Sequence, residues 1–143
     1  MGKINISRVM LGGVLASVVF IFIEFIVEGF VNLVFGFDEA NLARQYFPDI
    51  ILSGVRYQVV NIIYLISTCT FTIWLYAALC PKFGVGPKTA IIASLIVIIL
   101  IFLFMVNHIN MGIYPLKPAL ISLVISLAEF PISIAAGSSI YKS

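Results

Sequence analysis

Four long apolar stretches constrain this chain more than any other feature. They run over Val9–Phe35, Val59–Cys80, Thr89–Val106 and Ala119–Ile140. Each is near or above the length of about 20 apolar residues that a helix needs to cross a bilayer, and none shows the strict alternation of a membrane barrel strand. We therefore expect an all-α membrane protein, a bundle of four transmembrane helices.

The composition agrees with this class and excludes others. Of the 143 residues, 62% are hydrophobic and 10% are charged, whereas about 25% of the residues in a soluble domain are charged. The eight Lys and Arg residues are scattered along the chain, so they form no electrostatic footprint for nucleic acid. We expect one transmembrane domain over residues 1–143, with the lipid bilayer as its main partner.

The connections between the stretches differ in length. Pro81–Lys88 predicts a tight turn, because its two prolines and two glycines interrupt a helix. Asn107–Pro115 predicts a second short loop. The first connection is longer, and Asp38 could cap a short interfacial helix over residues 38–47. The first stretch is too long for a signal-peptide core and has no A-x-A-like cleavage site after it, so we expect it to be retained.

The basic residues near the ends of the stretches predict an orientation. Three of them, Arg44, Arg56 and Lys117, fall on one side of the membrane. The other five favour a cytoplasmic location for both termini in a multi-pass protein of the cell (inner, cytoplasmic) membrane. These five are Lys3, Arg8, Lys82, Lys88 and Lys142.

A weak internal similarity relates the second and fourth stretches. At a shift of 59 residues, Ile66, Ser67, Phe71, Ile73 and Ala77 match Ile125, Ser126, Phe130, Ile132 and Ala136. Such matches could reflect a parallel repeat of two helical hairpins. They also arise by chance in apolar sequence of low complexity.

The segment from Trp74 to Ala90, WLYAALCPKFGVGPKTA, carries a resemblance. It resembles a run in a family of small bacterial four-helix integral membrane proteins for which no activity is established. That family tends to carry one glutamate in the first span and one in the last, as Glu24 and Glu129 do here. The resemblance implies the four-helix topology and no specific function.

The most informative residues are the acids inside the stretches. A charge at bilayer depth costs roughly 2.5–3.5 kcal/mol even on permissive scales. Glu24 and Glu28 lie on a small and polar stripe of the first helix, and Glu129 lies on a similar stripe of the fourth helix with Ser126 and Ser133. The second helix adds Asn61. We expect these stripes to meet in a polar seam whose hydroxyls bond across the helices.

The seam has two explanations. The acids could form a mid-membrane site for a cation, a proton or a small amphiphile, as in a small transporter or channel. Alternatively, they could form a structural network of protonated carboxyls, or contact a partner, as in an accessory subunit of a larger membrane complex. The candidate ligand-binding residues are Glu24, Glu28, Asn61, Ser126, Glu129 and Ser133.

The first explanation makes a geometric prediction. The first and fourth helices should be neighbours, and the carboxyl oxygens of Glu24 and Glu129 should approach within roughly 3–6 Å. Pro131 leaves the carbonyl of Leu127 without its helical partner, which could either offer an oxygen near Glu129 or simply kink the helix.

Other residues carry weaker signals. His108 could supply one ligand to a haem or a metal, but a single histidine in a loop is more often solvated, so the cofactor and metal stay open. Cys69 and Cys80 are too far apart along one helix to form a disulfide. The sequence has no P-loop, H-E-x-x-H or G-x-S-x-G motif, which gives little support to an enzyme. Paired intramembrane glutamates could still act as acid and base on a lipid-like substrate, so a lipid-modifying enzyme stays a third, weaker alternative. A bundle this small leaves little room for an enclosed pathway, so we expect a homo-oligomer or a membrane-protein partner.

Overall fold

All regular structure in the described residues is α-helical. The computed structural model describes residues 4–36, 54–113 and 115–141. Within these ranges, each helix is long and apolar enough to cross a membrane, which confirms the expected bundle of four transmembrane helices. The helix expected over residues 38–47 lies outside the described residues. The helices are α1 (Ile6–Phe35), α3 (Val55–Phe83), α4 (Pro87–Asn110) and α5 (Leu116–Ser138).

The turn between α3 and α4 is shorter than the sequence predicts. We expected the helix to stop before Pro81, but α3 continues through it to Phe83. A proline in the last turn removes only one backbone hydrogen bond, so the helix tolerates it there. Gly84 ends the helix with a φ of 82°, a left-handed conformation that favours glycine, and its N–H donates to the carbonyl of Cys80. Pro87 then begins α4 in the first-turn position that suits proline.

The four helices form a ring in which each has two main neighbours. Helix α1 packs against α3 and α5, and α4 packs against the same two helices from the opposite side. The expected contact of the first and fourth membrane helices, α1 and α5, is therefore confirmed. Helices α3 and α5 lie across the diagonal and touch little.

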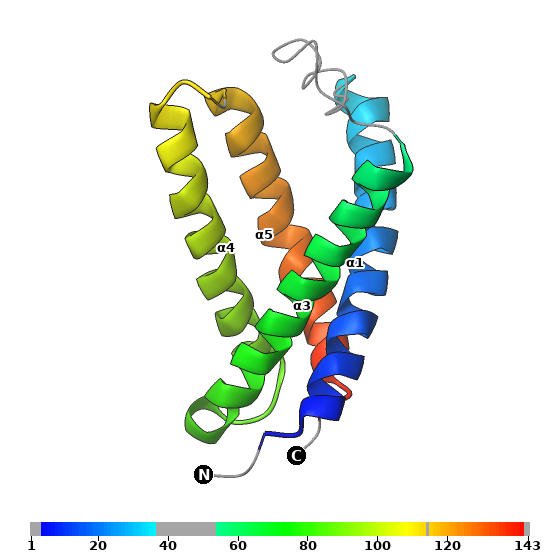
Figure 1. Cartoon of the computed structure of the whole chain (residues 1–143), viewed down its shortest axis with the longest axis vertical. Helices are drawn as coiled ribbons and strands as arrows, with labels where there is room; N and C mark the ends of the chain where they lie inside the picture. Colours follow the sequence, from blue (N-terminus) through cyan, green and yellow to red (C-terminus); the bar gives the residue numbers. More distant parts are fainter. Residues whose placement is uncertain (1–3, 37–53, 114, 142–143) are drawn as a thin grey trace.

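Close packing is confined to one half of the bundle. Nearly all buried side chains lie in the first half of α1 and α4 and in the second half of α3 and α5. Beyond Ser17 in α1, no described side chain of that helix is buried. Figure 1 shows the same asymmetry, because the pair α4 and α5 diverges from the pair α1 and α3 with distance from the end where α1 begins. The bundle is therefore closed at that end and splayed at the other.

Small residues make the contact between α1 and α5 possible. A Cβ added to Gly12 would lie 2.8 Å from the carbonyl oxygen of Gly137, and one added to Gly137 would lie 2.7 Å from the Cβ of Ala16. A Cβ on Gly13 would lie 2.6 Å from the Cα of Thr70 on α3. Because these glycines have no side chain, the backbones approach closely enough for dispersion forces to hold helices together in lipid.

Tyrosines tie the helix ends together at the closed end. The hydroxyl of Tyr76, in α3, accepts a hydrogen bond of 3.2 Å from the backbone N–H of Gly86 in the turn. Its ring meets the ring of Tyr141 edge to face, with centroids 6.2 Å apart. The hydroxyl of Tyr141 accepts from the N–H of Asn5, which caps α1. This chain of contacts joins the start of α1 to the turn and to the chain after α5.

The burial pattern gives no support to an internal repeat. Phe71 is 49% exposed whereas its match Phe130 is 6% exposed, and Ile73 is fully buried whereas its match Ile132 is 57% exposed. Residues that descend from a duplicated hairpin are expected to occupy similar environments, and these two pairs do not.

We predict that Gly137→Leu destabilises the bundle while the same change at Gly29 does not. A side chain at Gly137 would collide with Gly12 and Ala16, whereas nothing lies within 4 Å of a Cβ at Gly29 on α1. Overpacking of this kind costs about 1–3 kcal/mol. Thermal unfolding in mild detergent should show a lower Tm for Gly137→Leu, and equal Tm values for the two variants would contradict the close contact.

Candidate functional site

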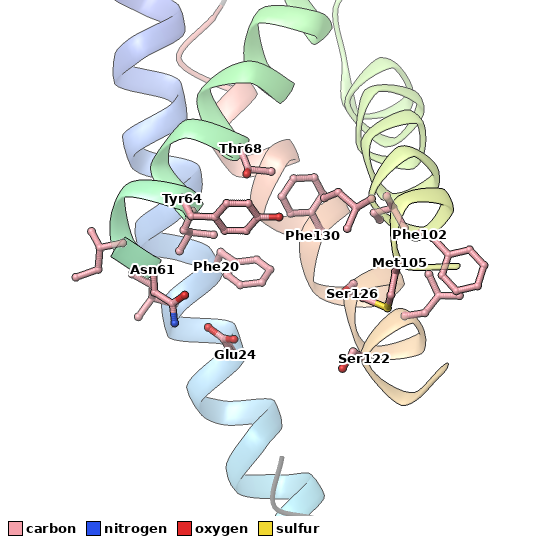
Figure 2. A pocket seen from close by; sticks show the side chains of 16 residues that line it. Phe20, Glu24, Asn61, Tyr64, Thr68, Phe102, Met105, Ser122, Ser126 and Phe130 are labelled. Carbon is pink, nitrogen blue, oxygen red and sulfur yellow. The ribbon is translucent and has the colours of Figure 1, made fainter. Parts of the chain in front are cut away.

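A cavity of about 370 Å³ lies among the four helices where close packing ends. Side chains from all four helices line it. Figure 2 shows Phe20, Glu24, Tyr64 and Phe130 toward the space between the helices. The cavity is partly open rather than sealed. Most of its lining is aliphatic or aromatic. The polar lining residues are Glu24, Asn61, Tyr64, Thr68, Ser122 and Ser126.

Helical spacing explains why these residues meet. Phe20 and Glu24 are four residues apart on α1, so they share one face. Asn61, Tyr64 and Thr68 repeat at three and four residues on α3 and share a face in the same way. Helix α5 presents Ser122, Ser126 and Phe130 at intervals of four residues. Helix α4 contributes the apolar wall, with Ile98, Ile101, Phe102 and Met105.

Two phenylalanines form the floor of the cavity. The rings of Phe20 and Phe130 meet edge to face with centroids 6.1 Å apart, a favourable geometry for aromatic pairs. Phe20 lies about 12 Å along α1 from Gly12, at 1.5 Å per residue. The aromatic pair therefore lies between Glu24 and the close contact of Gly12 with Gly137 along α1.

The structure brings together three of the six predicted site residues. Glu24, from α1, Asn61, from α3, and Ser126, from α5, all line the cavity. Glu28 is exposed on α1 and lies outside the lining, because the helices have diverged at that level. Glu129 and Ser133 are only 3% and 0% exposed, in the closely packed half, and they also lie outside the lining.

Glu24 and Glu129 therefore occupy different surroundings. Glu24 is exposed at the cavity, whereas Glu129 is buried beside Phe130 in α5. The neighbouring helices and the contact of Phe20 with Phe130 place the two acids in the same region of the α1 and α5 pair. The separation of their carboxyl oxygens stays a prediction.

Most of the hydroxyls do not act as expected. We expected them to bond across the helices, but Ser17, Thr72 and Ser133 each donate to the carbonyl four residues earlier in their own helix, at 2.7–2.9 Å. Contacts that do cross between helices include that of Ser17 with the thiol of Cys69 on α3 and that of Ser138 on α5 with the hydroxyl of Tyr76 on α3. A hydroxyl that bonds to a carbonyl of its own helix needs no partner on another helix in lipid. These small residues therefore allow neighbouring helices to pack closely more than they link them by hydrogen bonds.

The weaker candidates have local explanations. The Nδ1 atom of His108 lies 3.0 Å from the carbonyl oxygen of Phe104 in its own helix, and its ring contacts the Phe104 ring. Among the described residues, no group of three or more His, Cys, Asp or Glu side chains is placed to hold a metal ion. Cys69 and Cys80 are free thiols, as their spacing predicts. Pro131 lies within α5, which continues to Ser138.

The aromatic part of the cavity was not predicted. Tyr64 lines the cavity, and Tyr76 is 1% exposed in the closed half. A signal was available for Tyr64, because it lies three residues after Asn61 and four before Thr68. No such signal existed for Phe102 and Met105, which are two of many large apolar residues in α4.

Together, the fold and the cavity define a class: a four-helix membrane protein with an acid-bearing cavity among its described helices. Comparison with family models, with curated proteins and with solved structures gives no match.

We predict that the cavity admits small reagents while the closed half does not. Ser126→Cys places a thiol in the lining, whereas Ser133→Cys places one on the same helix where the side chain is fully buried. Both variants would be made with Cys69→Ala and Cys80→Ala. A small cationic thiol reagent should modify the first at least about ten-fold faster than the second, because modification requires access. Equal rates would contradict the boundary between the two halves.

Proposed function

We propose that this protein is a small transporter or channel that holds a cation, a proton or a small amphiphile at Glu24. The observation that carries the proposal is the convergence of Glu24, Asn61 and Ser126, from three different helices, on one cavity. An acid inside a membrane helix is costly. Glu24 lies at a cavity rather than against closely packed neighbours. A binding role at that cavity would explain why the chain keeps a residue that is costly to place in a membrane.

The chemistry of the lining suits reversible binding. A carboxylate can pair with a cation or take up a proton, and the amide of Asn61 can donate or accept hydrogen bonds. The hydroxyl of Ser126 adds a third polar group. The floor formed by Phe20 and Phe130 would keep a bound molecule from passing directly to the closed end, so transport would require these rings to separate.

We further propose that the closed end faces the cytoplasm, in the cell membrane. Arg8, Lys82 and Lys88 lie near that end, whereas Arg56 and Lys117 lie near the splayed end. Among the described residues, the closed end thus has more basic side chains than the splayed end, which is the excess that the positive-inside rule expects on the cytoplasmic side. In this orientation both termini are cytoplasmic, and the cavity is reached from the outer half of the membrane or from lipid.

A second candidate function is an accessory subunit, and a specific observation favours it. Glu28 and Asn32 are four residues apart on α1, and both are exposed outside the cavity lining. Polar side chains at this depth are stabilised by a partner helix or a second copy of the chain. On this account Glu28 docks the protein into a larger complex, and Glu24 has no transport role.

The transport proposal predicts that Glu24→Gln abolishes activity. In proteoliposomes, proton or cation flux should fall to the background of empty vesicles, and its dependence on pH should disappear, because Gln cannot be ionised. Glu28→Gln is the matched control, one turn away on the same helix and outside the lining. It should retain flux within about two-fold, since exposed substitutions have small effects. Unchanged flux in Glu24→Gln would contradict the proposal.

The accessory-subunit account predicts the opposite pattern. The isolated protein should give no flux, and a defined membrane partner should co-purify in mild detergent. Glu28→Gln combined with Asn32→Leu should then release the partner, while Glu24→Gln should leave it bound. Retention of the partner by the double variant would contradict this account.

A further inference from the structure

The walls of the cavity constrain its ligand more closely than the carboxyl does. Among the described lining residues there is one acid, Glu24, and no Lys, Arg or His. Aromatic residues from all four helices are among the other lining residues: Phe20 from α1, Tyr64 from α3, Phe102 from α4 and Phe130 from α5. Figure 2 shows the rings of Phe20, Tyr64 and Phe130 close to one another. The cavity thus combines a single acidic group with a lining rich in aromatic residues.

This combination disfavours an inorganic cation as the main ligand. Calcium takes six to eight oxygen ligands, and magnesium keeps several waters in an octahedral shell. The polar lining atoms are dispersed over three helices among apolar walls, and no described cluster of acids or histidines gathers to hold a metal. An ion stripped of its water would therefore lose more solvation than Glu24 alone could replace.

A large organic cation loses far less. Its charge is spread out and weakly hydrated, so entry into an apolar site costs little. The faces of Phe and Tyr rings attract such cations through their quadrupole, and a volume of about 370 Å³ lies within the range of sites for drug-sized molecules. We propose that the cavity binds lipophilic organic cations of single positive charge, with Glu24 as the counter-ion. This inference rests on the proposed function and names its ligand class.

The proposal couples binding to protons. A protonated Glu24 cannot serve as a counter-ion, so the cation and a proton compete for the same carboxyl. The groups that face it from α3 are Asn61 and Tyr64, and those from α5 are Ser122 and Ser126. Helix α4 presents only apolar side chains to the cavity. Further titratable groups nearby are Glu28, on α1, and Glu129, buried in α5.

Tetraphenylphosphonium is a suitable probe because its charge is delocalised, permanent and independent of pH. Equilibrium dialysis of the purified protein in detergent should show saturable binding to the wild type. Glu24→Gln should weaken it by at least about ten-fold, as the loss of a close charge partner does, while Glu28→Gln should leave it unchanged. Lowering the pH should weaken binding to the wild type and have no effect on Glu24→Gln.

Two controls separate charge and aromatic character from simple partitioning. Tetraphenylborate has the same shape and the opposite charge, so the wild type should bind it no better than Glu24→Gln does. Phe102→Leu keeps an apolar wall but removes a ring, and it should weaken binding of the phosphonium by about three- to ten-fold. Phe104→Leu, on the same helix but exposed outside the lining, should have no effect.

The outcomes distinguish the ligand class from the proposed function. The assignment of the ligand class would be overturned if Glu24→Gln bound the phosphonium as tightly as the wild type does. It would also be overturned if the wild type bound the borate as tightly as the phosphonium. If no saturable binding occurs but Glu24→Gln still abolishes proton flux, the ligand class is wrong and the transport function stands. If neither binding nor flux depends on Glu24, both proposals fail.

Discussion

The close approach of α1 and α5 at Gly12, Ala16 and Gly137 is the contact on which the rest of the structure depends. In lipid there is little hydrophobic force between helices, so association rests on contacts that only small residues permit. Here those residues occur at one end of the helices. Because large side chains follow them along α1, the helices are held together at that end and diverge beyond it.

The cavity follows from this divergence. Beyond the small-residue contact, the rings of Phe20 and Phe130 meet edge to face between α1 and α5. One turn further along α1, the space is wide enough to leave Glu24 exposed. The carboxyl of Glu24 is tolerated within the helix because it lies at the cavity rather than against lipid alone. The packing that stabilises the bundle and the site that carries the proposed function are thus parts of one arrangement.

Much of the fold could be predicted from the sequence, because four apolar stretches of sufficient length leave few alternatives in a bilayer. The neighbouring positions of α1 and α5 also followed, since both carry small and polar stripes. The continuation of α3 through Pro81 could not be predicted, because a helix accepts a proline in its last turn and the sequence does not show where that turn ends. The positions of Glu28 and Glu129 outside the cavity lining could not be read from helical periodicity either. Periodicity gives the face of a helix, but not the depth at which neighbouring helices part.

The central claim is that Glu24 exchanges protons with its surroundings through the cavity whereas Glu129 is sealed in the packed half. Carbon NMR of ¹³C-labelled glutamate side chains in lipid, with each signal assigned by its Glu→Gln variant, tests this directly. The account predicts that the carboxyl signal of Glu24 shifts over the pH range in which carboxyls titrate, while the signal of Glu129 stays fixed. A fixed signal for Glu24 together with a shifting signal for Glu129 would contradict it.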